Sequence, residues 1–410
     1  MNEMSNSDKR AKPPCPHFGS CGGCQLQDLS YSAQLEQKAI RLREMLGTFT
    51  LPELQLHAPP PLGYRNRIRL TLREVEGALL AGYLGDPEDL NERSNPQFVP
   101  ITQCSIAAPV LWRTAQAFLT LAADPQMKWL RSQTLTPDQL ELFTTADESR
   151  VLLTLYLRTG QKTPLAKLAA ELAAFCDSLC ANVPELVGAG IAFLPLAARG
   201  RRIEQPRPGP TWGAPGVNYS IVLEPQIQKP EPFTYWVPRG AFFQANRFLL
   251  PELLAVVTQA AASRSTHTAL AWDLYAGVGL FSQALARMFA KVTAVEIAEP
   301  AVTALLQKKV PNLQGVKATA LDFLRAAVLQ RDRPSCIVLD PPRSGLGTEV
   351  CALLSRIAAG ALIYVSCSPH ALAADLAPLI ASGYSIAELH LFDLFPQTEH
   401  IETVVMLTRA

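Results

Sequence analysis

The strongest constraint on the fold of this chain is a regular alternation of short apolar segments with helical segments after about residue 240. This alternation is typical of βαβ units, because each apolar segment has the length of a buried strand and each interval has room for one helix. Such units build a doubly wound parallel sheet, whose ligands bind at the carboxyl ends of the strands. We therefore predict a Rossmann-like α/β domain over residues 236–410. Its predicted strands cover residues 271–275, 291–297, 336–340, 361–367 and 402–408, preceded by a helix over 244–262.

The preceding part of the chain, residues 1–235, is predicted to form a separate β-rich domain. An amphipathic helix is expected over Tyr31 to Leu46, and we expect this helical region, at about 29–57, to pack on the second domain. The remaining expectations are a disordered lead-in over 1–14, strands and turns over 64–104, helices at about 107–123 and 164–180, and a loop over 200–215.

Composition and charge exclude several classes of protein. Lys and Arg total 37 against 36 Asp and Glu, so the chain lacks the strong basicity of a protein that coats nucleic acid, and any RNA contact must be local. The apolar runs are too short for a membrane helix, and the polar N-terminus lacks the features of a secretion signal. We expect a cytoplasmic protein, with a monomer as the default. Nine cysteines in such a chain favour metal binding or catalysis over disulfides.

A glycine-rich turn marks a candidate cofactor site. The segment Asp273-Leu-Tyr275-Ala-Gly277-Val-Gly279 ends one predicted strand and opens a helix, and Glu296 ends the next strand. Glycines let the backbone approach a ligand closely, and a carboxylate at this place can accept both hydroxyls of a ribose. Dinucleotide dehydrogenases use similar parts. Their third glycine would fall at Ser282, which favours another nucleoside-type cofactor.

Three further features lie at the ends of predicted strands. Asp340-Pro-Pro-Arg343 follows one strand, Cys367 follows the next, and Glu402 begins the last. An activated cysteine beside a carboxylate suits covalent catalysis followed by removal of a proton. A helix predicted to begin after Cys367 is expected to lower the pKa of its thiol. His400 is a rival for Glu402 as the base, and a small buried residue is the alternative role for Cys367.

A tight cysteine loop near the N-terminus predicts a metal centre. Cys15-x5-Cys21-x2-Cys24 is a chelating pattern, and thiolates are the usual ligands of structural zinc and of iron–sulfur clusters. Cys104 is the predicted fourth ligand, because the other cysteines fall in predicted core segments or at the catalytic position. The spacing is not the CxxxCxxC of radical enzymes, so a structural or RNA-positioning role is favoured. The residues alone leave zinc and an iron–sulfur cluster open.

An arginine row is the predicted RNA contact. In the segment YRNRIRLTLR, Arg65, Arg67, Arg69 and Arg73 share one face of a strand, while apolar residues occupy the other. Guanidinium groups bind phosphates and stack on bases. A solvated strand face is the alternative. A second, weaker candidate is the group Arg199, Arg201, Arg202 and Arg207.

Together these residues resemble the RNA uracil-C5 methyltransferase family, in particular its iron–sulfur members that act on 23S ribosomal RNA. The likeness rests on Cys15/Cys21/Cys24, Cys104, FFQAN, DLYAGVGLFS, VEI, DPPRSGL, YVSCSP and FPQTEHIETVVML, in this order. It implies a class I methyltransferase fold that uses S-adenosylmethionine, and a [4Fe–4S] cluster in preference to zinc. The implied site residues are Gln244, Tyr275, Glu296 and Asp340 for the cofactor, Cys367 as nucleophile, Glu402 as base, and Cys15, Cys21, Cys24 and Cys104 for the cluster.

Departures from the family pattern narrow the expectation. Ala276 stands where many relatives carry cysteine, and Leu280 where some carry a polar cofactor contact. Many relatives have an N-terminal barrel of the TRAM type, whereas only 14 residues precede Cys15 here, and the transfer-RNA branch lacks the cysteine cluster. Both features favour the compact ribosomal-RNA branch.

The target is expected to be an unpaired or loop uridine, because its ring must leave the base stack to react. The alternatives are the same chemistry on transfer RNA, an amino-group methyltransferase, and a non-catalytic iron–sulfur RNA-binding factor. An amino-group enzyme usually carries an aromatic residue where Arg343 stands and needs no cysteine.

Overall fold

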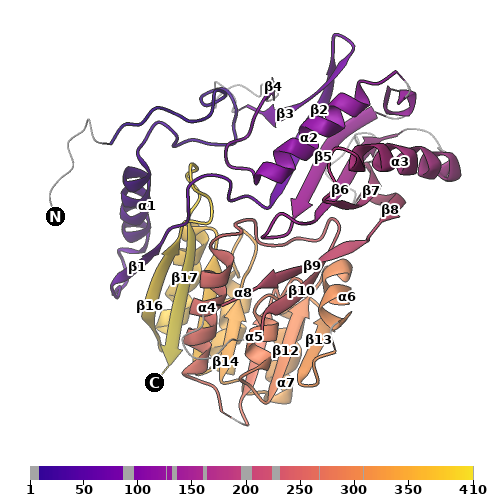
Figure 1. Cartoon of the computed structure of the whole chain (residues 1–410). Helices are drawn as coiled ribbons and strands as arrows, with labels where there is room; N and C mark the ends of the chain where they lie inside the picture. The colour runs from indigo at the N-terminus through magenta and orange to yellow at the C-terminus, as the bar shows by residue number, and fades with distance from the viewer. Residues whose placement is uncertain are drawn as a thin grey trace.

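Two large β-sheets with helices packed on them, and a two-stranded sheet, make up the described part of the structure (Figure 1), which is a computed structural model. It describes residues 9–85, 97–125, 127–131, 136–159, 164–194, 206–223, 231–266, 268–307 and 309–409. In Figure 1 the seven-stranded sheet lies above the eight-stranded sheet. No helix in these ranges is long and apolar enough to cross a bilayer.

The larger sheet has the strand order β1-β16-β17-β15-β14-β11-β12-β13, and all its strands except β17 run parallel. β11 pairs with both β12 and β14, so the order of the strands reverses direction beside it. The predicted doubly wound α/β sheet is confirmed, except that β17, predicted as one of its parallel strands, runs antiparallel. Its strands are β1 (Leu54–His57), β11 (Leu270–Leu274), β12 (Lys291–Glu296), β13 (Leu313–Lys317), β14 (Cys336–Leu339), β15 (Ala361–Ser366), β16 (Tyr384–Phe392) and β17 (Glu402–Arg409).

Helices cover both faces of this sheet because its central strands are apolar on both sides. In β14, Val338 packs in the core under one set of helices, and Ile337 packs in the core under the other. The first set is α4 (Leu250–Ala262), α5 (Ser282–Ala286) and α6 (Glu299–Gln307). The second set is α1 (Tyr31–Leu46), α7 (Ala320–Gln330), α8 (Thr348–Ile357) and α9 (Pro369–Ala381).

Part of the N-terminal region joins the larger sheet. Helix α1 spans the residues predicted for it, and Leu42 and Leu46 are fully buried in the core under α8 and α9. Strand β1 extends the sheet beside β16. The hairpin of β9 (Gly216–Ile221) and β10 (Phe233–Pro238) also packs in the core under α4. The domain boundary at residues 235 and 236 stays a prediction.

The smaller sheet has the order β4-β3-β2-β5-β6-β7-β8 and is antiparallel except for the pair β6 and β7, which α3 connects. Its apolar face packs against α2 and α3. The elements are β2 (Arg67–Val75), β3 (Ala78–Leu84), β4 (Phe98–Pro100), α2 (Pro109–Ala122), a 3-10 turn (Lys128–Arg131), β5 (Thr136–Thr144), β6 (Val151–Arg158), α3 (Leu165–Cys180), β7 (Leu186–Leu194) and β8 (Arg207–Gly213).

Two predicted elements were wrong. The loop over 200–215 contains β8, whose prolines are tolerated because β8 is the edge strand of its sheet. The helix predicted from Gln244 begins only at Leu250, because the Asn246 side chain accepts the backbone N–H groups of Phe248 and Leu249 and holds a turn there. The strands β1, β13 and β16 were not predicted.

Candidate active site

The predicted site residues meet at one rim of the larger sheet. Glu296 ends β12, while Tyr275, Asp340 and Cys367 directly follow β11, β14 and β15. Glu402 begins β17, which runs opposite to β15, so the start of β17 lies at the same rim; Thr403 pairs with Ser366. The sheet therefore places the five predicted residues at the ends where doubly wound folds bind ligands.

The glycine-rich turn after β11 opens onto a cavity. Tyr275, Gly277 and Gly279 all have positive φ, of 65°, 55° and 88°. For tyrosine this conformation is strained, and such strain is concentrated at functional sites. A Cβ atom at Gly277 would meet no atom within 4 Å, so the turn faces open space. The cavity, of about 350 Å³, is lined by Gln244, Tyr275, Gly277, Asp340 and neighbouring apolar residues.

The Glu296 carboxylate is tied to the same turn. Its Oε2 accepts the backbone N–H of Gly277 at 2.9 Å, and its Oε1 accepts those of Ile297 and Ala298 at 2.8 and 2.7 Å. A carboxylate offers about four acceptor positions. Glu296 therefore fixes the turn and keeps capacity for a further donor, such as a ribose hydroxyl.

Buried carboxyl groups give the rim an unusual electrostatic character. Gln244 Nε2 donates to Asp340 Oδ2 at 3.2 Å. Burial raises the pKa of Asp340 to about 7, with a contribution from nearby Asp273, and burial raises the pKa of Asp273 to about 7 as well. Asp273 Oδ1 has no hydrogen-bond partner among the described residues. These acidic groups suit a cationic ligand such as a sulfonium compound.

Glu402 lies close enough to Cys367 to affect the pKa of the thiol. Cys367 is half-buried and Glu402 is only 3% exposed. Burial raises the pKa of the Cys367 thiol, and Glu402 and Asp340 raise it further. The expected lowering by the helix N-terminus was therefore wrong in direction: helix α9 does begin at Pro369, but desolvation and two carboxyls outweigh it. Burial and Asp340 also raise the pKa of Glu402.

Arg343 is the positive group of this site. It lowers the pKa of both Cys367 and Glu402, and its Nη2 lies 3.4 Å from His400 Nε2. His400 therefore faces the site as well, but burial and Arg343 lower its pKa. Arg343 was recognised only as part of the DPPR motif and not as a site residue.

These pKa shifts predict an activity that rises with pH. In their predicted roles, Cys367 attacks as a thiolate and Glu402 removes a proton as a carboxylate. Both groups have raised pKa values, so acid would remove both reactive forms. We expect Arg343→Gln to move the rate profile to higher pH, because Arg343 lowers both pKa values. Turnover measured across the neutral range checks this, with Arg325→Gln on the exposed surface as the control. A rate that falls as pH rises through neutrality contradicts the assignment.

An exposed aromatic residue at the cavity edge was not predicted. Phe242 lines the cavity and is 71% exposed, whereas the adjacent Phe243 is buried in the core. Single exposed apolar side chains are common on folded proteins, so it is the position of Phe242 at the cavity, and not its exposure, that makes it a candidate contact. The FFQAN motif contained both residues, but nothing in it indicated which phenylalanine is exposed.

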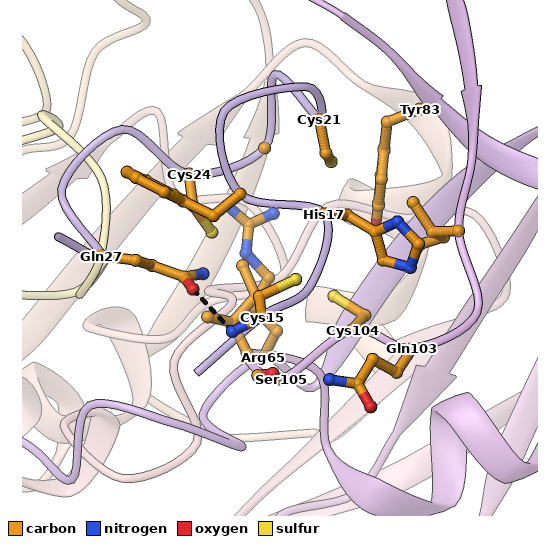
Figure 2. A pocket seen from close by; sticks show the side chains of 14 residues that line it. Cys15, His17, Cys21, Cys24, Gln27, Arg65, Tyr83, Gln103, Cys104 and Ser105 are labelled. Atoms are coloured by element: carbon orange, nitrogen blue, oxygen red, sulfur yellow. Dashed lines mark hydrogen bonds between the residues drawn. The ribbon is translucent and has the colours of Figure 1, made fainter. Parts of the chain in front are cut away.

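The four predicted metal ligands line one pocket, of about 490 Å³ (Figure 2). Burial raises the pKa of Cys24 to about 11, and the nearby Cys104 and Cys21 add to the rise; Cys15 in turn raises the pKa of Cys104. The pocket also contains His17, Tyr83 and Arg65, and Cys15 N donates to Gln27 Oε1 at 3.1 Å. In the part of the chain that the structure describes, no three His, Cys, Asp or Glu side chains are grouped to hold a metal ion.

The arginine row has acidic partners. Arg67 and Arg69 both pair with buried Glu141, and Arg73 pairs with Asp138. Arg67 is largely covered, whereas the side chains of Arg69 and Arg73 are 50% and 45% exposed. Arg65 lies in the cysteine pocket. Of the second candidate group, Arg207 is exposed on β8, and Arg199, Arg201 and Arg202 lie outside the described residues.

Comparisons with known proteins find RNA methyltransferases. A family model described as tRNA (Uracil-5-)-methyltransferase matches residues 222–410. The chain is 28% identical to the 23S rRNA (uracil(1939)-C(5))-methyltransferase RlmD of Chromohalobacter salexigens, over 100% of this chain and 78% of that one. It is also 28% identical to the 23S rRNA (uracil(747)-C(5))-methyltransferase RlmC of Shewanella amazonensis, over 96% of this chain and 97% of that one.

A solved structure shares the fold. The tRNA (uracil-54, C5)-methyltransferase of Pyrococcus abyssi, in complex with S-adenosyl-L-homocysteine, matches with a TM-score of 0.68 and 20% identity, over 95% of this chain and 86% of that one. The likeness covers both sheets and so shows an α/β methyltransferase fold. With the sequence relatives and the family model of residues 222–410, it shows that the chain is similar to RNA uracil-C5 methyltransferases.

Proposed function

We propose that the protein transfers a methyl group from S-adenosylmethionine to carbon 5 of a uridine in 23S ribosomal RNA, forming 5-methyluridine. The observation that carries this proposal is the meeting of Cys367, Glu402 and Asp340 at the rim beside the glycine-rich turn. The ribosomal substrate rests on the relatives named for 23S ribosomal RNA, which align over nearly the whole chain. Ribosomal RNA as substrate goes with a cytoplasmic location, and a monomer stays a prediction.

The four predicted cofactor contacts fit S-adenosylmethionine. Gln244, Tyr275 and Asp340 line the cavity, and Glu296 is bonded to its glycine-rich turn. The cofactor carries a positively charged sulfonium, which suits the buried carboxyl groups of the rim, and a ribose hydroxyl suits the remaining acceptor position of Glu296. When bound, it supplies an electrophilic methyl group.

The residues of the chain supply the rest of the chemistry. Carbon 5 of uracil is a weak nucleophile, so the Cys367 thiolate first adds to carbon 6 and pushes the electrons of the double bond towards carbon 5. Carbon 5 then accepts the methyl group. Glu402 takes the remaining proton of carbon 5, the carbon 5–carbon 6 double bond re-forms, and the thiolate leaves with the electrons of the carbon–sulfur bond.

The substrate is tested by methyl transfer to separate RNAs. The protein is incubated with labelled S-adenosylmethionine and either 23S ribosomal RNA or transfer RNA, and the product is digested to nucleosides and identified by mass spectrometry. We expect labelled 5-methyluridine from 23S ribosomal RNA. Labelled product from transfer RNA alone would overturn the choice of substrate, a methylated amino group would overturn the reaction, and no transfer at all would favour a non-catalytic binding factor.

We further propose that the cysteine pocket holds a [4Fe–4S] cluster on Cys15, Cys21, Cys24 and Cys104. In such a cluster each thiolate binds a different iron, so the four sulfurs surround a volume and need not converge on one ion as the ligands of zinc do. A pocket lined by four cysteine side chains offers the ligand set of such a cluster. Arg65, whose Nε has no partner among the described side chains, adds a positive charge suited to an anionic cluster.

Metal content tests the cluster. Protein purified without oxygen is expected to be brown, to absorb visible light and to contain iron and sulfide. Cys24→Ser should lower the iron content, while Cys180→Ser on α3 should leave it unchanged. A colourless protein that contains zinc would contradict the cluster, and one with neither metal would contradict a metal centre.

We propose Arg69 and Arg73 as contacts to RNA phosphates. Pairing with Glu141 and Asp138 holds the two arginines in place while their side chains stay about half exposed. Arg67 is covered, and Arg65 can reach only RNA that approaches the cysteine pocket. Of the four arginines predicted to contact RNA, we therefore propose only the two exposed ones, Arg69 and Arg73.

A further inference from the structure

The segment that leads into Glu402 is held by parts of the chain far away in sequence. Residues 393–400, here called the base loop, connect β16 to β17 and end two residues before Glu402. The Tyr64 hydroxyl donates to Pro396 O at 3.0 Å, and Asn246 Nδ2 donates to Leu394 O at 3.0 Å. Two further sets of contacts come from α1 and from the residues after Cys24.

The first set centres on Gln397. Gln34 of α1 grips this residue twice: its Nε2 donates to Gln397 Oε1 and its Oε1 accepts Gln397 N, each at 3.0 Å. Gln397 O accepts the backbone N–H groups of Gln25 and Leu26, each at 3.0 Å. Gln34 also donates to Leu26 O at 2.9 Å. The buried side chain of Gln34 thus joins α1, the residues that follow Cys24 and the base loop.

The second set is a buried ion pair. Lys38 Nζ lies 2.6 Å from Asp393 Oδ1 and donates to Phe395 O at 3.1 Å, and the Tyr31 hydroxyl donates to Asp393 Oδ2 at 3.0 Å. The side chains of Lys38 and Asp393 are 2% and 0% exposed. Burying two charges costs free energy. We therefore interpret this hydrogen-bonded ion pair as fixing the position of the base loop rather than as adding net stability.

Backbone strain in the base loop indicates that these contacts impose its shape. Gln397 has a φ of 69°, which lies in the left-handed region that residues other than glycine and asparagine seldom adopt. Such a conformation persists where the surroundings over-determine it. Gln397 takes part in four hydrogen bonds, two with the Gln34 side chain and two with the backbone of Gln25 and Leu26.

We propose that Gln34 is a positioning residue for proton removal, acting through Gln397 on the carboxylate of Glu402. The proposal rests on the proposed function, in which Glu402 takes the carbon-5 proton. The base loop also carries His400, which contacts Arg343, so a shift of the loop alters both the direction of the carboxylate and its charged neighbour. Cys367 and Asp340 follow other strands, β15 and β14, and the hydrogen bonds described above for Gln34 and Gln397 do not reach them.

The expected defect is therefore confined to one step. Addition of Cys367 to carbon 6 and acceptance of the methyl group precede the step of Glu402. If the carboxylate is displaced, the carbon 5–hydrogen bond persists, the carbon 6–sulfur bond cannot break, and methylated RNA stays joined to the protein. A displacement of about 1 Å can slow a proton transfer by roughly 100-fold.

The experiment compares two labels in single-turnover reactions of the full-length protein. The RNA carries tritium at carbon 5 of its uridines, and S-adenosylmethionine carries a carbon-14 methyl group. Wild-type protein should release one tritium for each methyl transferred. We expect Gln34→Ala to transfer methyl at nearly the wild-type rate but to release tritium roughly 10- to 100-fold more slowly, with doubly labelled RNA covalently attached to protein. Gln37→Ala, on the exposed face of the same helix, is the matched control.

A milder variant guards against loss of the fold. Asparagine tolerates the left-handed φ of residue 397, but its shorter side chain cannot reach Gln34 Nε2, so Gln397→Asn should show the same imbalance to a smaller degree. Thermal unfolding of each variant is measured alongside. Equal slowing of methyl transfer and tritium release, or no slowing in either variant, overturns the positioning role while leaving the proposed function intact. Failure of wild-type protein to transfer methyl or release tritium overturns the proposed function itself.

Discussion

Replacement of Cys367 by alanine is expected to abolish methyl transfer, with a loss of roughly 10⁴-fold or more. The reason is chemical: without addition of a thiolate to carbon 6, carbon 5 of uracil lacks the electron density to accept the methyl group. Binding of S-adenosylmethionine should change little, because Cys367 does not line the cavity beside the glycine-rich turn. Single-turnover incorporation of labelled methyl into RNA, with calorimetric titration of the cofactor, measures the two effects separately.

The control for this variant is another half-buried cysteine. Cys180→Ala removes a thiol from α3, which packs on the smaller sheet, where its Sγ donates to Leu186 O. We expect it to keep wild-type activity. If Cys367→Ala retained turnover comparable to Cys180→Ala, covalent catalysis at this position would be excluded.

Replacement of Glu402 by glutamine is expected to stop the reaction after methyl transfer and before removal of the carbon-5 proton. Glutamine keeps the shape of the side chain but cannot accept the proton, so turnover should fall by roughly 10²- to 10⁴-fold. Methyl transfer should still take place, and the protein should accumulate as a covalent complex with RNA that contains ordinary uridine. Stability should not suffer, because burial already disfavours the charge of Glu402 and raises its pKa.

Denaturing gel electrophoresis with labelled RNA detects this complex. Glu299→Gln, at the exposed start of α6, serves as the control and should release its product normally. Absence of the complex together with loss of methyl transfer would mean that Glu402 acts earlier in the reaction. Normal turnover would instead assign proton removal to another group, of which His400 is the nearest rival in sequence.

The rim of the larger sheet could be predicted from the sequence because its residues lie at strand ends. Asp340 and Cys367 each follow an apolar strand, and the carboxyl ends of parallel strands meet at one edge. Glu402 reaches this rim because the last strand runs antiparallel to its neighbours, a direction that was not predicted. Local pattern was sufficient for Asp340 and Cys367, whereas the role of Glu402 rested on the family resemblance.

The support and the electrostatics of the site could not be predicted in this way. Gln34 and Gln397 are 363 positions apart, and no local pattern pairs them. The pKa of Cys367 follows from burial and from Glu402 and Asp340, which lie on other strands, so the local effect of the helix N-terminus gave the wrong direction. In the same way, Glu141 of β5 could not be recognised in advance as the partner of Arg67 and Arg69.

The transient carbon–sulfur bond at Cys367 is tested most directly with RNA that contains 5-fluorouridine. Fluorine at carbon 5 cannot be removed as a proton, so the reaction should stop after methyl transfer. Mass spectrometry of the digested complex should then find a Cys367 peptide joined to a nucleotide that carries both the methyl group and fluorine, formed only when S-adenosylmethionine is present. Methylated RNA with no attached peptide, or attachment at a cysteine other than Cys367, would contradict the account.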